Sequence, residues 1–313
     1  MKVGCLVIAF NVDLWIYDML ENGRDWIDTF YIAYPKRPWC YSEKQRLTNE
    51  NPTTLDRVKL DSLNINYKII EGDWKYDEDT RNAIRCIAKA DGCNWLVVQD
   101  ADEFYTEEGW NELKKIMRQN LGRNVAITTK WLNFWKSTEC IILNRDGSRF
   151  SSNECAALSL AEDSCFTYSR SVSARLIETN IVCFHLGYVL TDKQALLKVS
   201  TWAHTKDVRI NDWYRYKWKA WKKQTKYLHP GNPPVWERAV PCEASLKIPA
   251  ECKKFTSAYL DVNQISKNES MRMVSLCGEM WYDLTVMIAF RIKSFRSLLS
   301  IQKHRIVKGS KNV

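Results

Sequence analysis

The sequence predicts an α/β protein whose central sheet is mainly parallel and is flanked by helices. Two observations lead to this fold class. Short, continuous apolar runs alternate with amphipathic segments of helical period over residues 2–122. The apolar runs lack a polar face, which is typical of strands that are covered on both sides. Repeated alternation of strand and helix favours parallel strands joined by crossover helices.

Four strands and three helices are expected along this part of the chain. The strands are residues 2–10, 26–35, 66–74 and 94–99, and the helices are residues 12–23, 77–92 and 106–122. Pro35 ends the second strand, and Gly23 closes the first helix. Acidic residues in the first turn favour a helix that begins at Asp77, because they face the positive end of the helix dipole. Thr106 is the expected N-cap of the last helix.

The composition is that of a folded protein with a basic tail. The chain has 313 residues, of which 45% are hydrophobic and 27% charged, and its formal net charge is +9. The tail has no Asp or Glu, and its basic residues are Arg291, Lys293, Arg296, Lys303, Arg305, Lys308 and Lys311. We expect this tail either to meet a phosphate-rich surface or to be a solvated terminus.

The cysteines and the apolar runs predict a cytoplasmic protein, with peripheral contact at a membrane surface as an alternative. Eleven cysteines are scattered without a CxxC pair, so free thiols in a reducing compartment are expected. The N-terminal apolar run is interpreted as a strand, because it has no small-residue cleavage site of a signal peptide. The apolar stretch at residues 284–290 is far too short to cross a bilayer.

The stretch VQDADEF places carboxylates directly after an apolar strand. Asp100 and Asp102 follow the strand at residues 94–99, and ligands bind beyond the carboxyl ends of strands in open α/β sheets. If the chain stays extended there, both side chains turn to the same side. With a third donor from elsewhere, they would form a site for Mg²⁺ or Mn²⁺. The alternative is a polar turn that ends the strand.

Arg81 is expected at the same edge of the sheet. The helix at residues 77–92 must run antiparallel to the strand at residues 94–99, so its N-terminus lies near Asp100. Free N–H groups at a helix N-terminus and an arginine fork both suit phosphate. The alternative for Arg81 is an ion pair with Asp77 on the same helix.

The segment TRNAIRCIAKADGCNWLVVQDADEF resembles the nucleotide-binding core of GT-A glycosyltransferases, close to the family 2 type. The likeness extends over residues 1–240, including the late segment CFHLGYV. It implies a GT-A catalytic domain at residues 1–240 and a mostly helical appendage at residues 241–313. It also implies transfer of a sugar from a nucleotide-diphosphate sugar to a glycan or lipid-linked acceptor, with a divalent metal.

The resemblance assigns roles to particular side chains. The residues that it places against the nucleoside are Ala9, Phe10, Asn11, Tyr34 and Asp73. It assigns the diphosphate to Arg81, the ribose or the metal to Asp100, and the metal to Asp102. His185 is the candidate for the distal metal ligand, with His204 second. Glu103 would take this place if neither histidine does.

An inverting enzyme of this type needs a general base for the acceptor hydroxyl. Glu162 and Asp163 are our candidates, and Glu154 is the alternative, although all three could equally be surface acids. A retaining enzyme needs no such base, so the stereochemistry stays open.

Two other functions compete with this interpretation. A nucleotidyltransferase should carry a Gly-rich loop after the first strand, but residues 9–15 contain no glycine. A basic nucleic-acid-binding protein would leave the carboxylates of DADEF unexplained, so we expect no nucleic-acid partner. Residues 280–301 are predicted to form an amphipathic helix with basic residues. It either docks on the catalytic domain or lies on a membrane surface.

Overall fold

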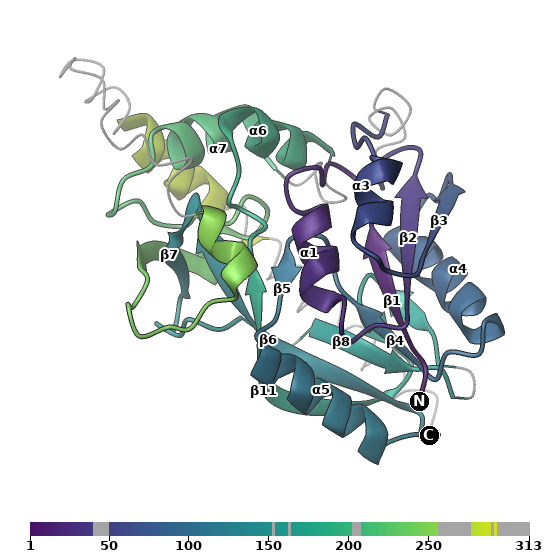
Figure 1. Ribbon diagram of the computed structural model, residues 1–313. Helices are drawn as coiled ribbons and strands as arrows, with labels where there is room; N and C mark the ends of the chain where they lie inside the picture. Colours follow the sequence, from purple (N-terminus) through teal and green to yellow (C-terminus); the bar gives the residue numbers. More distant parts are fainter. Residues whose placement is uncertain are drawn as a thin grey trace, which may run out of the picture.

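The computed structural model describes residues 1–39, 50–151, 154–161, 164–201, 208–255, 277–288 and 291–292. It forms a large curled sheet with helices on both sides (Figure 1). Glu162, Asp163, His204 and the basic tail from residue 293 onward lie outside the described residues. The predictions made for them therefore stay predictions.

The strands and helices alternate most regularly in the first part of the chain. The strands are β1 (Val3–Ile8), β2 (Thr29–Pro35), β3 (Tyr67–Gly72), β4 (Trp95–Val98), β5 (Glu103–Phe104), β6 (Val125–Trp135), β7 (Ser137–Asn144), β8 (Glu154–Ser159), β9 (Phe166–Tyr168), β10 (Ser171–Val172), β11 (Arg175–His185) and β12 (Trp236–Pro241). The α-helices are α1 (Ile16–Gly23), α3 (Arg57–Ser62), α4 (Asp77–Ala90), α5 (Glu107–Gln119), α6 (Asp192–Thr201) and α7 (Ile210–Trp213). Shorter helical turns are η2 (Tyr214–Lys219), η3 (Pro233–Val235) and η4 (Ala250–Phe255). Residues 277–288 and 291–292 are also helical.

The predicted α/β fold class is confirmed. β3, β2, β1 and β4 pair in parallel, in that order. Beyond β4 the sheet becomes mixed, because β8 inserts antiparallel between β4 and β6, and β7 and β12 continue antiparallel. β11 then pairs in parallel with β6 and antiparallel with the short β5.

Alternate residues of β1 show how both faces of the sheet are covered. Val3, Cys5 and Val7 belong to the apolar core that also contains buried residues of α1 and α5. Leu6 and Ile8 belong to a second core, which includes buried residues of α4. Every residue of β1 is therefore buried, as its unbroken apolar sequence predicted (Figure 1).

The helix ends follow local sequence signals. The side-chain oxygen of Thr106 accepts a hydrogen bond from the backbone N–H of Gly109, which confirms Thr106 as the N-cap of α5. α4 begins at Asp77 with three acidic residues in its first turn, as expected. The structure adds α3, which the sequence patterns did not predict. Its N-cap is Asp56, which accepts a hydrogen bond from the N–H of Lys59.

Residues beyond 240 pack against the larger part of the chain. η4 lies beside α1, where Lys254 forms an ion pair with Asp18. Residues 277–288 lie beside α7 (Figure 1), and Arg209 donates a hydrogen bond to Thr285. In the described part of the chain, no helix has the length and apolar composition needed to cross a membrane.

Candidate functional site

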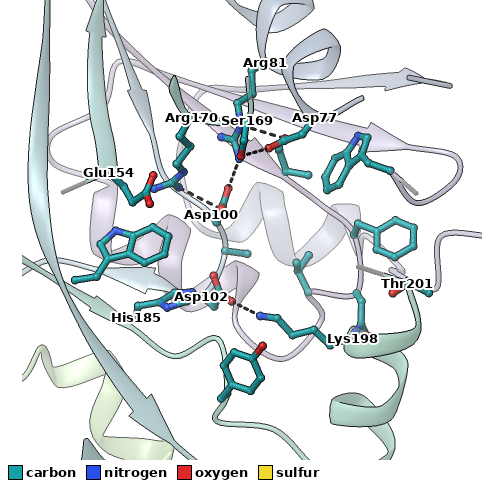
Figure 2. Close-up of a pocket in the computed structure, with 18 of the residues that line it drawn as sticks. Asp77, Arg81, Asp100, Asp102, Glu154, Ser169, Arg170, His185, Lys198 and Thr201 are labelled. Atoms are coloured by element: carbon teal, nitrogen blue, oxygen red, sulfur yellow. Dashed lines mark hydrogen bonds and ion pairs between the residues drawn. The ribbon is translucent and has the colours of Figure 1, made fainter. Parts of the chain in front are cut away.

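A cavity of about 460 Å³ opens at the carboxyl ends of β1, β4 and β11. This is the edge of the sheet at which α/β proteins bind ligands. The end of β1 contributes Phe10 and Asn11, and the turn after β4 contributes Asp100 and Asp102. Figure 2 shows that polar and charged side chains from α4, β8, β11 and α6 converge on these carboxylates.

The segment after β4 is a turn and does not stay extended. The backbone N–H of Glu103 donates to the carbonyl of Asp100 at 3.0 Å, and the side chain of Gln99 donates to the carbonyl of Glu103 at 2.8 Å. These bonds fold the chain back, so that the two aspartates meet different partners. The sequence predicted the position of the carboxylates, and the polar turn that we gave as the alternative is the conformation that the structure shows.

Asp100 is paired with two buried arginines. Arg81 Nη2 lies 3.4 Å from Asp100 Oδ1, and Arg170 Nη2 lies 3.2 Å from Asp100 Oδ2. Burial alone raises the pKa of Asp100, but the two guanidinium groups outweigh it, and the net pKa is below its usual value. The carboxylate is therefore charged and neutralised by protein groups.

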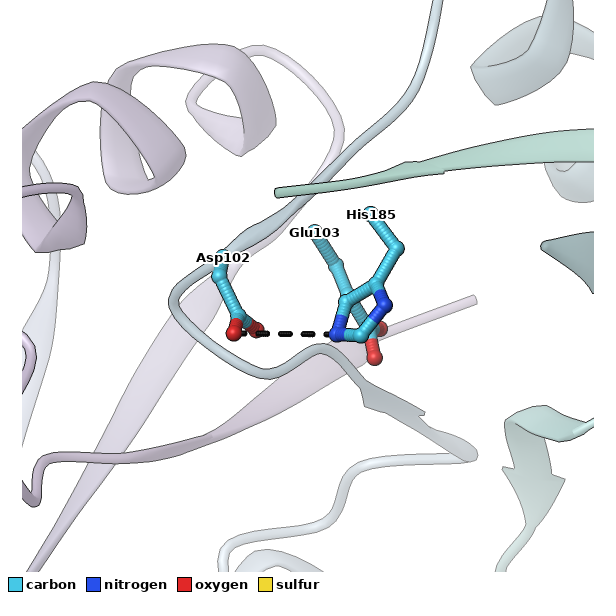
Figure 3. A group of neighbouring side chains, drawn as sticks. All are labelled: Asp102, Glu103 and His185. Carbon is cyan, nitrogen blue, oxygen red and sulfur yellow. Dashed lines mark ion pairs between the residues drawn. The ribbon is translucent and has the colours of Figure 1, made fainter. Parts of the chain in front are cut away.

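Asp102, Glu103 and His185 form a separate group of possible metal ligands (Figure 3). One donor atom from each side chain lies within 4.8 Å of the others. β5 and β11 bring them together, because Glu103 is the antiparallel partner of His185 in the register of these strands. Asp100, which we predicted as a ligand, is not part of this group.

The His185 ring is held by two neighbours. Its Nδ1 lies 2.6 Å from Asn133 Oδ1, and its ring packs against that of Trp131 in a tilted arrangement, with the ring centroids 4.5 Å apart. If Nδ1 carries the proton that Asn133 accepts, the lone pair of Nε2 points at Asp102, 3.6 Å away. This is the arrangement in which a neutral histidine can bind a metal ion.

Lys198 of α6 also reaches Asp102. Its ammonium lies 3.2 Å from Asp102 Oδ2 and donates to the carbonyl of Gly187 at 2.8 Å. Burial raises the pKa of Asp102, but Lys198 and His185 lower it by a larger amount. The net pKa of Asp102 therefore lies well below its usual value. Asp102 therefore already has one cation beside it.

The environment of Glu103 indicates that this group of side chains suits a divalent cation. This side chain is completely buried, and among the described residues Glu103 Oε2 has no hydrogen-bond partner. Burial, helped by Asp100 and Asp102, raises the pKa of Glu103 to about 8 despite the ion pair with Arg170. A buried carboxyl with an unused oxygen beside a second carboxylate and an imidazole nitrogen is a donor set suited to Mn²⁺ or Mg²⁺.

The N-terminus of α4 lies next to Asp100, as the sequence predicted, but acids already occupy its first turn. Arg81 is buried and forms an ion pair with Asp77 at 3.0 Å. The hydroxyl of Ser169 donates to Asp77, and its backbone N–H donates to Glu78. Among the described residues, Nη1 of Arg81 has no hydrogen-bond partner, so one donor of the fork is unused.

The residues predicted to contact the nucleoside divide into two sets. Phe10 and Asn11 line the cavity, and Asn11 has a positive φ of 56°, a conformation that asparagine tolerates better than most residues. Ala9, Tyr34 and Asp73 do not line it. Tyr34 donates its hydroxyl hydrogen to the carbonyl of Thr53 at 2.8 Å, so it supports the loop behind the site.

Comparisons with known proteins find only distant likenesses. No protein-family model matches the chain, and no curated protein matches it. Residues 1–349 of TarS from S. aureus, solved in complex with UDP-GlcNAc, are 14% identical at a TM-score of 0.29, covering 42% of this chain and 35% of that chain.

A second TarS structure, also of residues 1–349, is 12% identical at a TM-score of 0.37, covering 70% of each chain. HddC from Yersinia pseudotuberculosis is 12% identical at a TM-score of 0.33, covering 60% of this chain and 94% of that chain. Likeness at this level carries no conclusion about the reaction. The chemistry has to be inferred from the side chains of the cavity.

One predicted candidate for the general base lies at the site. Glu154, at the start of β8, lines the cavity close to Arg170 (Figure 2). Burial raises the pKa of Glu154, although Arg170 and Arg81 oppose this. A raised pKa makes a carboxylate a stronger base.

Arg170 and Lys198 were not recognised from the sequence. Arg170 lies between the two short strands β9 and β10, a segment without a periodic pattern. Lys198 lies on α6, and no pattern in the sequence of this helix distinguishes it from a lysine that faces solvent. The aromatic part of the lining was also missed, and it consists of Trp15, Trp39, Tyr76, Trp131, Tyr168, Tyr188 and Trp236. Apart from the resemblance that named Phe10, no signal in the sequence gathers these rings around one cavity.

Proposed function

We propose that this protein is a glycosyltransferase that uses a nucleotide-diphosphate sugar and Mn²⁺ or Mg²⁺. The observation that carries the proposal is the junction of two kinds of group in one cavity. Asp102 and His185 line the cavity beside Asp100, which is held by two arginines. The third possible metal ligand, Glu103, is completely buried next to them. A metal ion bound there would offset the negative charge that develops on a departing diphosphate.

The charge of the cavity supports the need for a cation. Its lining contains the carboxylates of Asp77, Glu78, Asp100, Asp102 and Glu154, against the cationic side chains of Lys75, Arg81, Arg170 and Lys198. A diphosphate brings further negative charge into this nearly balanced site. A divalent ion would shift the balance toward positive charge, as diphosphate binding requires.

The arginines offer unused donors on the same side of the cavity. Nη1 of Arg81 and Nη1 of Arg170 are buried, and neither has a hydrogen-bond partner among the described residues. A buried guanidinium donor without a partner is costly, and a phosphate oxygen would satisfy it. We therefore assign the diphosphate to Arg81, as the resemblance implied, and also to Arg170, which the sequence analysis did not name.

Aromatic rings supply surfaces for the nucleoside and the sugar. The rings of Phe10 and Trp39 lie 6.3 Å apart at the end of β1, and Trp39 is fixed by a hydrogen bond to Thr80. We assign the base to this pair and the sugar to the side of Trp131. Glu154 is the base that we assign to the acceptor hydroxyl. Glu162 and Asp163 keep their place as alternatives.

A donor screen tests the proposal. The protein is incubated with a panel of nucleotide-diphosphate sugars, with Mn²⁺ or with EDTA, and thermal stability and donor hydrolysis are measured. We expect one donor to stabilise the protein and to be hydrolysed only when Mn²⁺ is present. Asp102→Asn should lower the rate about 100-fold or more while the folded structure is kept, because a charged ligand is lost.

The screen also separates the competing functions. Release of pyrophosphate from a nucleoside triphosphate and a sugar phosphate would identify a nucleotidyltransferase and reject the proposal. Near-native turnover of Asp102→Asn would reject the metal site at this position. Glu112→Gln on the exposed face of α5 is a matched control for loss of one carboxylate, and it should have no effect.

A further inference from the structure

The helix at residues 277–288 exposes large apolar side chains along one face. Met280 is 66% exposed, Trp281 65%, Leu284 54% and Ile288 49%. At about 100° per residue, these four side chains lie within an arc of about 100° on the helix surface. Ile292, a short distance further along the chain, is also 49% exposed. We call Met280, Trp281, Leu284 and Ile288 the apolar stripe.

The opposite face of this helix is fixed to the protein by both charged and apolar side chains. Lys217 of η2 is completely buried, and its ammonium lies 3.1 Å from Glu279 and 2.7 Å from Asp283. Tyr282, on the same side, is almost completely buried. The helix therefore packs with its two acids, Tyr282 and Val286 toward the protein, and with its apolar stripe outward.

This orientation is held by buried charge. Turning the apolar stripe inward would remove Glu279 and Asp283 from Lys217 and leave a buried ammonium without a partner. Breaking one side of a buried ion pair is strongly unfavourable. The stripe therefore stays at the surface, where contiguous exposed apolar side chains mark an interaction site.

The charges near the stripe indicate what it meets. Both acids of residues 277–292 are paired with Lys217, so no carboxylate lies on the outward face. Arg291 is exposed, and the sequence of residues 293–313 contains six further Lys and Arg and no Asp or Glu. An apolar face followed by basic residues matches a bilayer that contains anionic lipids. A second copy of the chain fits less well, because pairing two stripes would bring basic segments together.

We propose that the helix at residues 277–288 lies on the surface of an anionic membrane, with the apolar stripe inserted at the level of the headgroups. Trp281 suits this interface, because an indole has a large apolar ring and one polar N–H. The exposed Arg291, together with the basic residues in the sequence that follows, would attract the lipid phosphates. This proposal does not depend on the glycosyl transfer proposed above, since it uses none of the residues of the cavity.

Vesicle flotation of the full chain tests the proposal. We expect the protein to float with vesicles of phosphatidylcholine and phosphatidylserine, to bind vesicles of phosphatidylcholine alone at least tenfold less, and to be released by salt. The double variant Trp281→Glu, Leu284→Glu should lose at least tenfold in binding. The matched control is Val58→Glu, because Val58 on α3 is 80% exposed and far from this helix in sequence; it should bind as the unchanged protein does.

Three results would overturn the proposal. The first is that the unchanged protein does not bind vesicles that contain phosphatidylserine. The second is that the double variant binds them as strongly as the unchanged protein does. The third is that Val58→Glu loses as much binding as the double variant. Sedimentation velocity is measured alongside. If the unchanged protein is a dimer that does not bind vesicles, and the double variant is a monomer, the stripe serves self-association instead. If the double variant does not fold, Met280→Gln, Ile288→Gln replaces it, with the same tenfold loss expected.

Discussion

The ammonium of Lys198 lies 3.2 Å from Oδ2 of Asp102, the carboxylate that we assign to the metal. A protein cation therefore occupies one side of the proposed ligand group. His185 Nε2 approaches the same oxygen at 3.6 Å. Lys198 and a divalent ion are thus expected to compete for Asp102, because two cations on one carboxylate repel each other.

Replacing Lys198 should strengthen metal binding. In Lys198→Met the competing charge is removed while most of the side-chain volume is kept. We expect the Mn²⁺ concentration for half-maximal binding to fall about tenfold. The reason is that removing one positive charge close to a partly screened cation site removes a repulsion of that order. Isothermal titration with Mn²⁺ alone measures this, and Lys193→Met on the same helix is the control. A rise in the required Mn²⁺ would mean that Lys198 supports the site instead of competing with it.

The parallel half of the fold could be predicted because its signals are local. β1 and β4 are unbroken apolar runs, and α4 and α5 have clear helical periods bounded by acids and a capping threonine. These patterns depend on neighbours in sequence. They also located the carboxylates after β4 and the N-terminus of α4 at the same edge of the sheet.

The rest of the site depends on contacts between distant segments. The group of possible ligands forms because His185 at the end of β11 pairs with Glu103 in β5. No local pattern encodes this pairing, nor the antiparallel insertion of β8 between β4 and β6. Arg170 was missed for the same reason, since only the folded chain brings it to Asp100 and Glu103.

The pH dependence of stability should reveal the partial burial of Lys136. Burial lowers the pKa of this ammonium to about 8. Below pH 8 the group is protonated in both the folded and the unfolded chain, and the cost of burying the charge is fully present. Between about pH 8 and pH 10.5 the folded chain loses the proton first, so stability rises with pH by about 2–3 kcal/mol from this group.

Chemical unfolding of Lys136→Met provides the comparison. We expect the variant to be more stable than the unchanged protein at pH 7, and the difference to shrink as the pH rises through this window. Methionine keeps the side-chain volume and the same backbone strain at φ 63°. A difference that does not change with pH would contradict the lowered pKa.

Arg81→Ala should affect both stability and diphosphate binding. Arg81 is buried and paired with Asp77 and Asp100, so its loss should cost about 3 kcal/mol in the free energy of unfolding. If Nη1 also meets a phosphate oxygen, a nucleoside diphosphate should lose much more affinity than the matching nucleoside. Calorimetry with both ligands separates the two effects, with Arg118→Ala on α5 as the control. Equal weakening of both ligands would show that Arg81 is structural only.

His185→Ala should raise the Mn²⁺ concentration needed for half-maximal activity, and high Mn²⁺ should partly restore activity, since Asp102 would still hold the ion.

The contact between His185 Nδ1 and Asn133 Oδ1, at 2.6 Å, allows a sharper test. Asn133→Ala removes the acceptor that orients the ring, and loss of such a partner costs about 10- to 100-fold in metal affinity. Asn133→Asp keeps an acceptor and should stay close to the unchanged protein. The metal titration should therefore rank the unchanged protein and Asn133→Asp together, above both Asn133→Ala and His185→Ala. If neither alanine variant shifts the titration, the imidazole is not a ligand, and the ion would be held by Asp102 and Glu103 without it.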